Sequence, residues 1–458
     1  KMPAMYVGPY AQVDAELTLK LWNYLAAQLT KEELWPIANL ELNLLPCLID
    51  MTWRGVRIDQ DRVERTRNHL IKEEKATLAK IKHVAGQDVE LWAAASIAKA
   101  FDKLSIPYPR TEKNAPSFTK SFLADHPHEL AQLIVRARNL NKTSGTFINT
   151  IMKHCHADGR IHGHINQIRS DDGGTVSGRI SMSNPNLQQI PARDPELGPM
   201  IRSLFLPEEG EQWAAIDFSQ QEPRILVHYA YVYGRSRGAQ MAGVEEFVTA
   251  YREDPDMDFH TMVAEMANIP RKQAKTINLG MMYGMGVNKL SDQLDIDVDE
   301  AKGLVGQYHD RVPFVKGLMN GVMNSLNSRG SSGSVRSILG RKCRFDLWEP
   351  ATFAMHKALP YQDALKEYGE TTRLKRAYTY KALNRLIQAS AADMTKQAMV
   401  NIYEQGRLPL VQIHDEIAMS VKNREDANTV AEIMENAVPL EIPSKCDVEI
   451  GPSWGEAS

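Results

Sequence analysis

Two acidic residues at the ends of apolar segments are the first candidates for chemistry. The stretch "VQIHDEIAMS" (411–420) places three ionisable side chains, with Asp415 in the middle, inside an apolar run. The stretch "WAAID" (213–217) is a short apolar strand pattern that ends in Asp217. A charge in a buried strand is costly unless it is paired, binds a metal or lies at an exposed turn. A polar hairpin tip explains Asp415 alone, whereas a magnesium site requires Asp217 and Asp415 to meet, because Mg²⁺ uses one or two carboxylates together with substrate phosphates.

A second candidate is the stretch "IPRKQAKTINLGMMYGMG" (269–286), in which four residues follow one another at spacings of four: Arg271, Lys275, Leu279 and Tyr283. Such residues drift only slowly around one face of a helix, so the face presents two cations, an apolar side chain and an aromatic ring over about 18 Å. This ladder suits a nucleoside triphosphate, with cations on the phosphates and the ring near the base. An amphipathic surface helix with solvated cations fits the spacing equally well.

The residues after Asp217 allow two interpretations. Ser219 and Glu222 have the Ser-x-x-Glu spacing of a helix capping box. Pro223 weakens that interpretation, because it stands where the helix needs its first backbone donor. Glu222 is therefore also a candidate site residue.

Composition sets the broad class. The chain has 458 residues, 43% of them hydrophobic and 24% charged, which is ordinary for a globular protein with several structural units. It contains no apolar run of eighteen residues and no apolar signal core, so we expect neither a membrane span nor a secretory leader. Its four cysteines lack CxxC spacing, which indicates a reducing, cytoplasmic setting. The net charge of −3 hides basic stretches at 136–179 and 271–289, which are either solvated faces or nucleic-acid surfaces.

Hydrophobic periodicity predicts an α+β fold. Helical patterns alternate with short strands, so a sheet must be assembled from distant parts of the chain. We expect helices at about 59–86, 128–141, 259–330 and 379–405, and hairpins around Asp158-Gly159 and at 333–345.

Six segments in a fixed order then identify a resemblance: "SGRISMSNPNLQQIPAR" (177–193), "DFSQQEPRI" (217–225), Arg-x3-Lys-x2-Asn-x4-Tyr-Gly (271–284) preceded by "DFH" (258–260), "KALNRLIQASAAD" (381–393), "QIHDE" (412–416) and "VEIGPSWGEA" (448–457). Together they resemble the motifs of family A DNA polymerases, the bacterial polymerase I enzymes and their phage relatives. The chain looks like a phage or viral member, and because it begins at Lys1 we expect a Klenow-like fragment of a longer protein.

The resemblance implies a right-hand architecture with an antiparallel palm sheet and helical fingers and thumb. The expected units are an exonuclease remnant and linker (1–45), the thumb (46–165), the first part of the palm (166–225), the fingers (226–380) and the second part of the palm (381–458).

It also implies template-directed DNA synthesis from deoxynucleoside triphosphates on a primer-template. Asp217, Asp415 and the backbone carbonyl of Phe218 would bind two Mg²⁺ ions, for which Mn²⁺ can substitute. Arg271 and Lys275 would act catalytically on the phosphates. Glu416 would support the metal ligands. We expect a monomer, with processivity or replisome proteins as further partners.

Other roles follow from the resemblance, residue by residue. The nucleotide-binding set is Arg271, Lys275, Leu279, Tyr283, Glu222, His260 and Gln220, with Glu222 beneath the sugar excluding a 2′-hydroxyl. The DNA-binding set is Arg179, Gln188, Arg193, Asn384, Gln388 and His414. Of these, His414 would contact the primer terminus, and Arg179, Gln188, Asn384 and Gln388 would hold the duplex through sugars and the minor-groove acceptors that every base pair presents.

Three residues depart from the family pattern. Leu279 stands where relatives usually have phenylalanine or tyrosine, Pro223 replaces a leucine, and Tyr380 stands where many bacterial relatives have arginine. At the N-terminus, Tyr10 and Asp14 resemble the last proofreading motif. The earlier proofreading carboxylates are absent from the chain, so we expect no 3′–5′ exonuclease activity.

Other interpretations fit parts of the sequence. The set His154, Cys155, His156, His162 and His164 resembles a zinc site, but the Asp-Gly turn predicts that these residues alternate on paired strands. A single-subunit RNA polymerase shares the palm chemistry, although Glu222 and "PNLQQIP" disfavour it. An inactive scaffold would have no use for the two acids and the two cations. Copying of RNA templates stays open.

Overall fold

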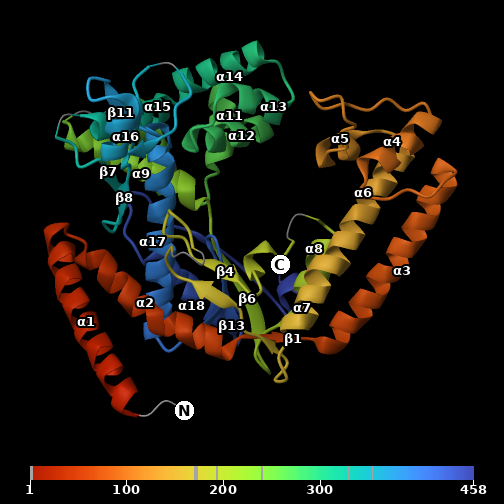
Figure 1. The fold of residues 1–458 in the computed structure, drawn as a ribbon, viewed down its shortest axis with the longest axis horizontal. Coiled ribbons are helices and arrows are strands. Elements are labelled where there is room, and N and C mark those ends of the chain that lie inside the picture. The colour runs from red at the N-terminus through yellow and green to blue at the C-terminus, as the bar shows by residue number, and fades with distance from the viewer. Residues whose placement is uncertain are drawn as a thin grey trace.

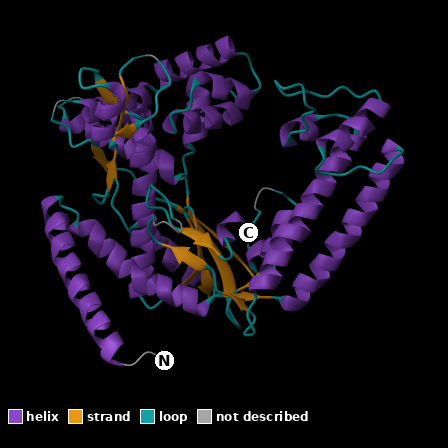
Figure 2. Ribbon diagram, viewed as in Figure 1, coloured by secondary structure: helices purple, strands orange, loops and turns teal. Residues whose placement is uncertain are grey.

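Two helical arms rise from a base that contains the main sheet (Figure 1). The computed structural model describes residues 4–169, 174–191, 194–238, 241–328, 330–352 and 354–457. Strands gather mostly at the base and helices fill the arms (Figure 2), so the expected α+β right-hand architecture is confirmed. None of the helices in the described ranges is both long and apolar enough to cross a bilayer.

The palm sheet, at the base, has four antiparallel strands in the order β12-β13-β6-β14. Their bounds are β6 (Gln212–Phe218), β12 (Pro409–Ile413), β13 (Glu416–Val421) and β14 (Cys446–Gly451). Ala214 and Ile216 of β6 join one hydrophobic cluster, whereas Trp213 and Ala215 join another. The sheet is therefore buried on both faces, which explains why β6 is an unbroken apolar run.

Three helices pack on one face of the palm sheet: α9 (Gln221–Ser236), α17 (Ala382–Glu404) and α18 (Arg424–Glu435). Near the opposite face lie a π-helical turn (Thr143–Ile148), α7 (Asn149–His154) and α8 (Leu197–Arg202). The sheet thus has support on both sides, and the strand ends near Asp217 open into a cavity.

The thumb arm is built on two paired helices, α3 (Gln60–Ala85) and α6 (Glu129–Lys142), with α4 (Ala94–Lys103) and α5 (Lys120–Asp125) at the tip. Asp59 caps α3 by accepting a hydrogen bond from the Arg62 amide at 2.8 Å, and Gly86 ends it at a φ of 62°. The cap and terminus predicted from the sequence are confirmed.

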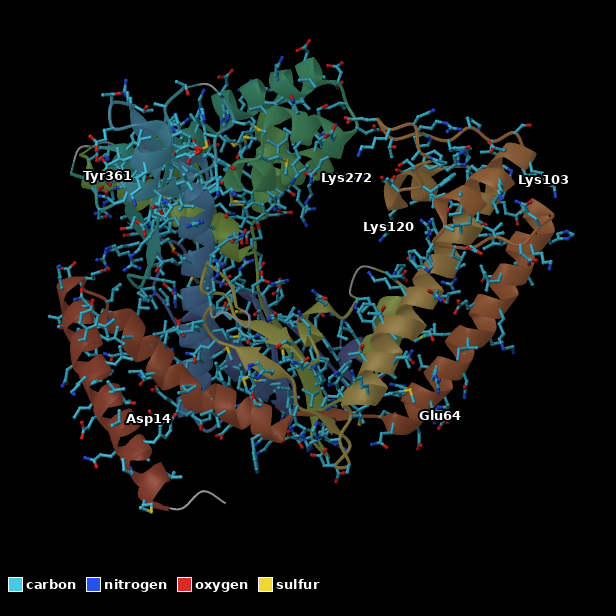
Figure 3. The ribbon with its side chains drawn as sticks, viewed as in Figure 1. Asp14, Glu64, Lys103, Lys120, Lys272 and Tyr361 are labelled. Carbon is cyan, nitrogen blue, oxygen red and sulfur yellow. The ribbon has the colours of Figure 1, made fainter. Side chains whose placement is uncertain are left out.

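The fingers arm contains the helices expected between 259 and 330, in five segments: α11 (Phe259–Ala267), α12 (Arg271–Met282), α13 (Val287–Leu294), α14 (Val298–Arg311) and α15 (Pro313–Asn327). They follow α10 (Val244–Glu253). The predicted hairpin at 333–345 is confirmed as β7 (Ser334–Arg336) and β8 (Lys342–Arg344). The space between the two arms stays open when side chains are drawn, with Lys272 on one side and Lys120 on the other (Figure 3).

Smaller elements complete the fold: α1 (Ala4–Lys31), α2 (Trp35–Arg54), the three-stranded sheet of β1 (Val56–Ile58), β2 (Arg160–Ile161) and β5 (Phe205–Leu206), the pair β3 (His164–Asn166) and β4 (Ser181–Ser183), and the sheet of β9 (Leu347–Pro350), β10 (Leu359–Pro360) and β11 (Leu374–Arg376) beside α16 (Tyr361–Tyr368).

One predicted hairpin is wrong in extent. The Asp158-Gly159 turn exists, but Cys155 and Ile161 form only a single bridge across it. The reason is that α7 continues to His154 before the turn, while the strands after it pair with β1 and β4. The histidines therefore do not alternate on two paired strands.

Candidate active site

Asp217 and Asp415 come together where β6 ends and the β12–β13 hairpin turns. The β12–β13 hairpin turns through His414 and Asp415, and His414 adopts a φ of 58°, as tight turns require. The Phe218 amide donates to the Asp415 carbonyl at 3.3 Å. The predicted hairpin tip is thus confirmed, and the pairing joins acids that lie about two hundred positions apart in the sequence.

Further acids line up with this pair. In the strand register Asp217 lies between Glu416 of β13 and Asp447 of β14. Residues directly opposite each other in an antiparallel sheet share a face, so these three carboxylates form one row. Asp447 lies outside the six motif segments, and the register of β14 shows that it is a neighbour of Asp217.

The negative charge of the row formed by Asp217, Glu416 and Asp447 is only partly compensated. Burial, reinforced by Asp415, Glu416 and Asp447, raises the pKa of Asp217 to about 8. Burial also raises the pKa values of Asp415 and Glu416 above their ordinary range. One Glu416 carboxylate oxygen is buried without a hydrogen-bond partner. Like charges in a buried site repel one another unless a cation or a proton neutralises them.

These properties fit divalent cations held partly by the protein. Within the described ranges, no group of three or more Asp, Glu, His or Cys side chains is arranged to hold a metal unaided. Mg²⁺ seldom needs such a cage, because waters and substrate phosphates complete its shell. Asp217, Asp415 and the Phe218 carbonyl would supply the protein ligands.

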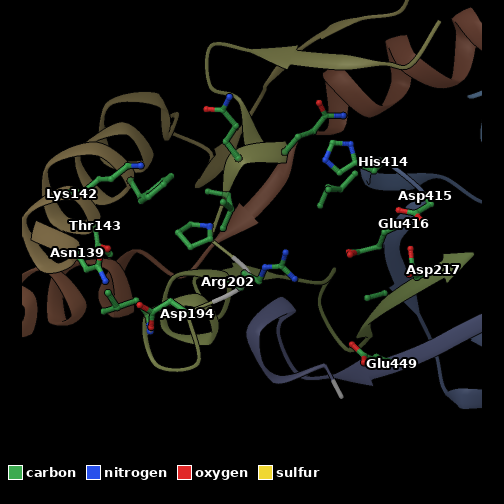
Figure 4. Close-up of a pocket in the computed structure, with 18 of the residues that line it drawn as sticks. Asn139, Lys142, Thr143, Asp194, Arg202, Asp217, His414, Asp415, Glu416 and Glu449 are labelled. Carbon is green, nitrogen blue, oxygen red and sulfur yellow. The ribbon is translucent and has the colours of Figure 1, made fainter. Parts of the chain in front are cut away.

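A cavity of about 700 Å³ leads from the thumb to these acids. Its thumb side contains Lys142, Asn139 and Thr143, and its palm side contains Arg202 and the carboxylates (Figure 4). Arg202 lies 4.6 Å from the Trp454 ring centroid and reaches toward Glu416. The sequence alone did not single out Arg202.

The fingers helix α12 carries Arg271, Lys275 and Leu279 of the predicted ladder, and Tyr283 follows the helix as its C-cap residue. Its opposite face is buried through Ala274, Ile277, Asn278 and Met281, so the helix is also amphipathic. Lys275 is exposed, and Leu279 is half-buried. Arg271 is exposed and donates from Nε to Asp258 Oδ2 at 2.6 Å. The amphipathic interpretation of the spacing is therefore confirmed, and the nucleotide-binding interpretation stays a prediction.

His260 lies behind this helix. It is buried, and Asn278 Nδ2 lies 2.9 Å from its Nδ1. Burial lowers the pKa of His260 to about 4, so the ring is neutral near pH 7. A neutral ring held by Asn278 supports α12 from α11.

Glu222 lies at the junction of palm and fingers. Arg179 Nη2 donates to Glu222 Oε1 at 2.5 Å, and the Tyr283 hydroxyl donates to Glu222 Oε2 at 2.6 Å. Gln388 of α17 lies close enough to the Tyr283 hydroxyl to influence its pKa. Helix α9 begins after Gln220 without any side-chain cap. The capping-box interpretation is therefore wrong, because Glu222 is engaged by Arg179 and Tyr283.

The remaining predicted residues divide between the cavity and the scaffold. Gln188 lines the cavity and donates to the Gln412 carbonyl at 3.0 Å, while His414 is exposed at the hairpin tip. Asn384 is half-buried on α17, one turn before Gln388. Gln220 uses its amide on the backbone of Met257 (3.0 Å) and Phe259 (2.8 Å). Arg193 lies outside the described residues.

The residues of the predicted exonuclease remnant and the histidines considered for a zinc site lie away from the two acids. Tyr10 and Asp14 are exposed on α1. His162 is held by the Thr52 carbonyl (2.9 Å) and by Asp158 (3.1 Å), and its ring centroid lies 4.9 Å from that of His156.

Comparison with known proteins agrees with this geometry. The profile described as DNA polymerase family A matches residues 60–456. A DNA-directed DNA polymerase of Pseudomonas phage M6 is 37% identical over 502 residues, covering 100% of this chain and 71% of the relative. A thermostable DNA polymerase I of Thermus filiformis is 30% identical over 475 residues, covering 99% of this chain and 52% of the relative.

A solved structure is also similar: the POL domain of Pol1 from M. smegmatis in complex with DNA primer-template and dNTP. It has a TM-score of 0.75 and 26% identity, covering 95% of this chain and 74% of that chain. The family profile spans most of the chain, including the two acids and the fingers helix. This chain belongs to DNA polymerase family A, a family of DNA-directed DNA polymerases.

Proposed function

We propose that this polymerase adds deoxynucleoside monophosphates to a primer 3′-hydroxyl under template direction, with two Mg²⁺ ions, and releases pyrophosphate. The observation that supports this most is that Asp415, in the turn between β12 and β13, meets Asp217 of β6 in a cavity that reaches the thumb. Bound metal ions would lower the pKa of the primer hydroxyl and neutralise charge on the triphosphate.

Side chains of the polymerase bind the triphosphate and supply a proton. Arg271 and Lys275 bind the phosphates from α12, and Lys275 donates a proton to the leaving pyrophosphate. Arg271 exchanges its partner Asp258 for phosphate when the nucleotide binds, since the pair is exposed and exposed pairs are weak. His260 and Gln220 hold the segments that carry these groups.

The palm holds the primer-template near the primer end. Arg179, Gln188, Asn384, Gln388 and His414 contact the duplex near the primer end. Arg193 is assigned to the same surface from the sequence motif. All six residues lie in the palm (166–225 and 381–458). The other proposed units are the thumb (46–165), the fingers (226–380), and a remnant and linker at 1–45.

The direct test is primer extension with Mg²⁺, DNA primer-template and each dNTP in turn. We expect addition of the nucleotide complementary to the template, together with one pyrophosphate for each nucleotide added. Addition that ignores the template, or no addition with Mg²⁺ or Mn²⁺, would contradict the proposal. An RNA template in a parallel reaction tests reverse transcription.

Sugar selection is proposed to rest on Glu222, beneath the nucleotide sugar. Glu222→Ala is expected to raise ribonucleotide use relative to deoxynucleotide use by at least about tenfold, because the truncation opens space beside the 2′-carbon. The measurement is the ratio of kcat/KM for rNTP and dNTP. An unchanged ratio in the variant would remove Glu222 from this role.

Leu279 is proposed to face the sugar of the incoming nucleotide. By family resemblance, a tyrosine here offers a hydroxyl where a dideoxynucleotide lacks its own, and leucine offers none. We expect the polymerase to discriminate strongly against ddTTP, and Leu279→Tyr to relieve this by roughly tenfold to a hundredfold, the range for one hydrogen bond to a charged group. Competition between dTTP and ddTTP measures it. Leu279→Phe is the control, and an equal gain in both variants would contradict a hydroxyl effect.

A further inference from the structure

Four charged side chains form a buried ion network between the fingers and the palm: Glu41 of α2, Arg341 before β8, and Asp393 and Lys396 of α17. Arg341 donates from Nη2 to Glu41 Oε1 at 2.6 Å and from Nε to Asp393 Oδ1 at 2.7 Å. Lys396 Nζ donates to both Glu41 oxygens, at 2.7 and 3.0 Å. The Asp393 and Lys396 side chains are 0% and 1% exposed.

Such a network adds little net stability, because the cost of desolvating the charges offsets most of their attraction. Two cations against two carboxylates leave it formally neutral. Breaking one pair leaves a buried charge unpaired, which is costly. The network therefore favours one arrangement of the backbone segments that it joins, and its contacts identify those segments.

The network contacts both Gln167 and the backbone of Gly178. Gln167 donates to Glu41 Oε2 at 2.6 Å, and its carbonyl accepts from Lys396 at 2.9 Å. Gly178 has a φ of +86°, and a Cβ there would lie 2.7 Å from Arg341 Nε. The guanidinium therefore packs directly against the backbone of Gly178, which only glycine permits.

Arg179 follows Gly178 directly and donates to the buried Glu222 at 2.5 Å. The other Glu222 oxygen accepts from Tyr283 at 2.6 Å. A continuous set of contacts thus runs from the ion network through Gly178 and Arg179 to the carboxylate proposed to select the sugar.

We propose that Arg341 is a positioning residue for sugar selection: through Gly178 it fixes Arg179, and through Arg179 it fixes Glu222. This inference rests on the proposed role of Glu222. The flat fork of arginine binds Glu41 and Asp393 at once while lying against Gly178. A lysine ammonium keeps the charge but cannot reproduce that planar, two-partner geometry.

The test is Arg341→Lys, which keeps the network neutral. We expect discrimination against ribonucleotides to fall about tenfold, the effect of weakening one charged hydrogen bond, with primer-template affinity unchanged. Arg344→Lys is the matched control, because Arg344 lies three residues away and pairs with Glu32 at the surface. Selectivity is a ratio of kcat/KM values, so a smaller folded fraction cancels. Glu41→Gln, which removes the network's other contact to Arg341, is expected to change the ratio in the same direction.

A double-mutant cycle tests the positioning role of Arg341 separately from the proposed role of Glu222 in sugar selection. If Arg341 acts through Glu222, Arg341→Lys changes the rNTP/dNTP ratio in the original chain but not in the Glu222→Ala background. An effect of Glu222→Ala with none of Arg341→Lys overturns the positioning role alone. No effect of Glu222→Ala overturns the role of Glu222 itself. Equal effects of Arg341→Lys in both backgrounds would show that Arg341 acts by another route.

Discussion

Asp217→Asn is expected to reduce single-turnover primer extension by at least about 10³-fold, and Asp415→Asn by a similar factor, because metal ligation supplies several kcal/mol of transition-state stabilisation. Each change removes a ligand charge without changing side-chain volume. Primer-template affinity, measured by fluorescence anisotropy, should remain largely intact, since these acids repel DNA rather than bind it.

Asp447→Asn is the matched control for these variants. Asp447 faces Asp217 from β14 and lines the same cavity, but it lies outside the motif that carries the metal ligands. We expect a small change in rate. A loss as large as that of Asp217→Asn would mean that the wrong pair of carboxylates has been assigned.

Lys275→Ala is expected to lower the maximal rate of nucleotide addition by about 10²-fold to 10³-fold, within the range for loss of a general acid together with a phosphate contact. Lys275 is exposed on α12 and has no ion-pair partner among the described residues, so its removal leaves no buried charge. Rapid-quench kinetics with saturating dNTP separates the chemical step from binding.

Lys289→Ala, on the neighbouring helix α13, controls for the lost surface charge. It should leave the maximal rate unchanged. If Lys275→Ala raises only the KM for dNTP and leaves the rate intact, then Lys275 binds phosphate without donating a proton.

The sequence predicted those parts of the site that are encoded locally. Asp217 ends an apolar strand, Asp59 and Gly86 bound a helix, and the face of α12 follows from spacings of four. Each depends on residues within a few turns of one another, where periodicity and caps are informative.

What the sequence did not predict depends on pairings between distant segments. Asp447 becomes a neighbour of Asp217 only through the register of β14. Arg341 reaches Gly178 across more than a hundred and fifty residues, and no local pattern encodes that contact. The extended hairpin at Asp158-Gly159 was wrong because tertiary pairing with β1 and β4 overrode the turn signal.

The central claim is that Asp217 and Asp415 hold two divalent cations at the primer end. Electron paramagnetic resonance can count Mn²⁺ ions bound to the complex of this polymerase with a dideoxy-terminated primer-template and the next dNTP. We predict two tightly bound ions in the original chain and fewer in Asp217→Asn. Two ions retained with unchanged affinity in Asp217→Asn, or no tight ion in the original chain, would contradict the account.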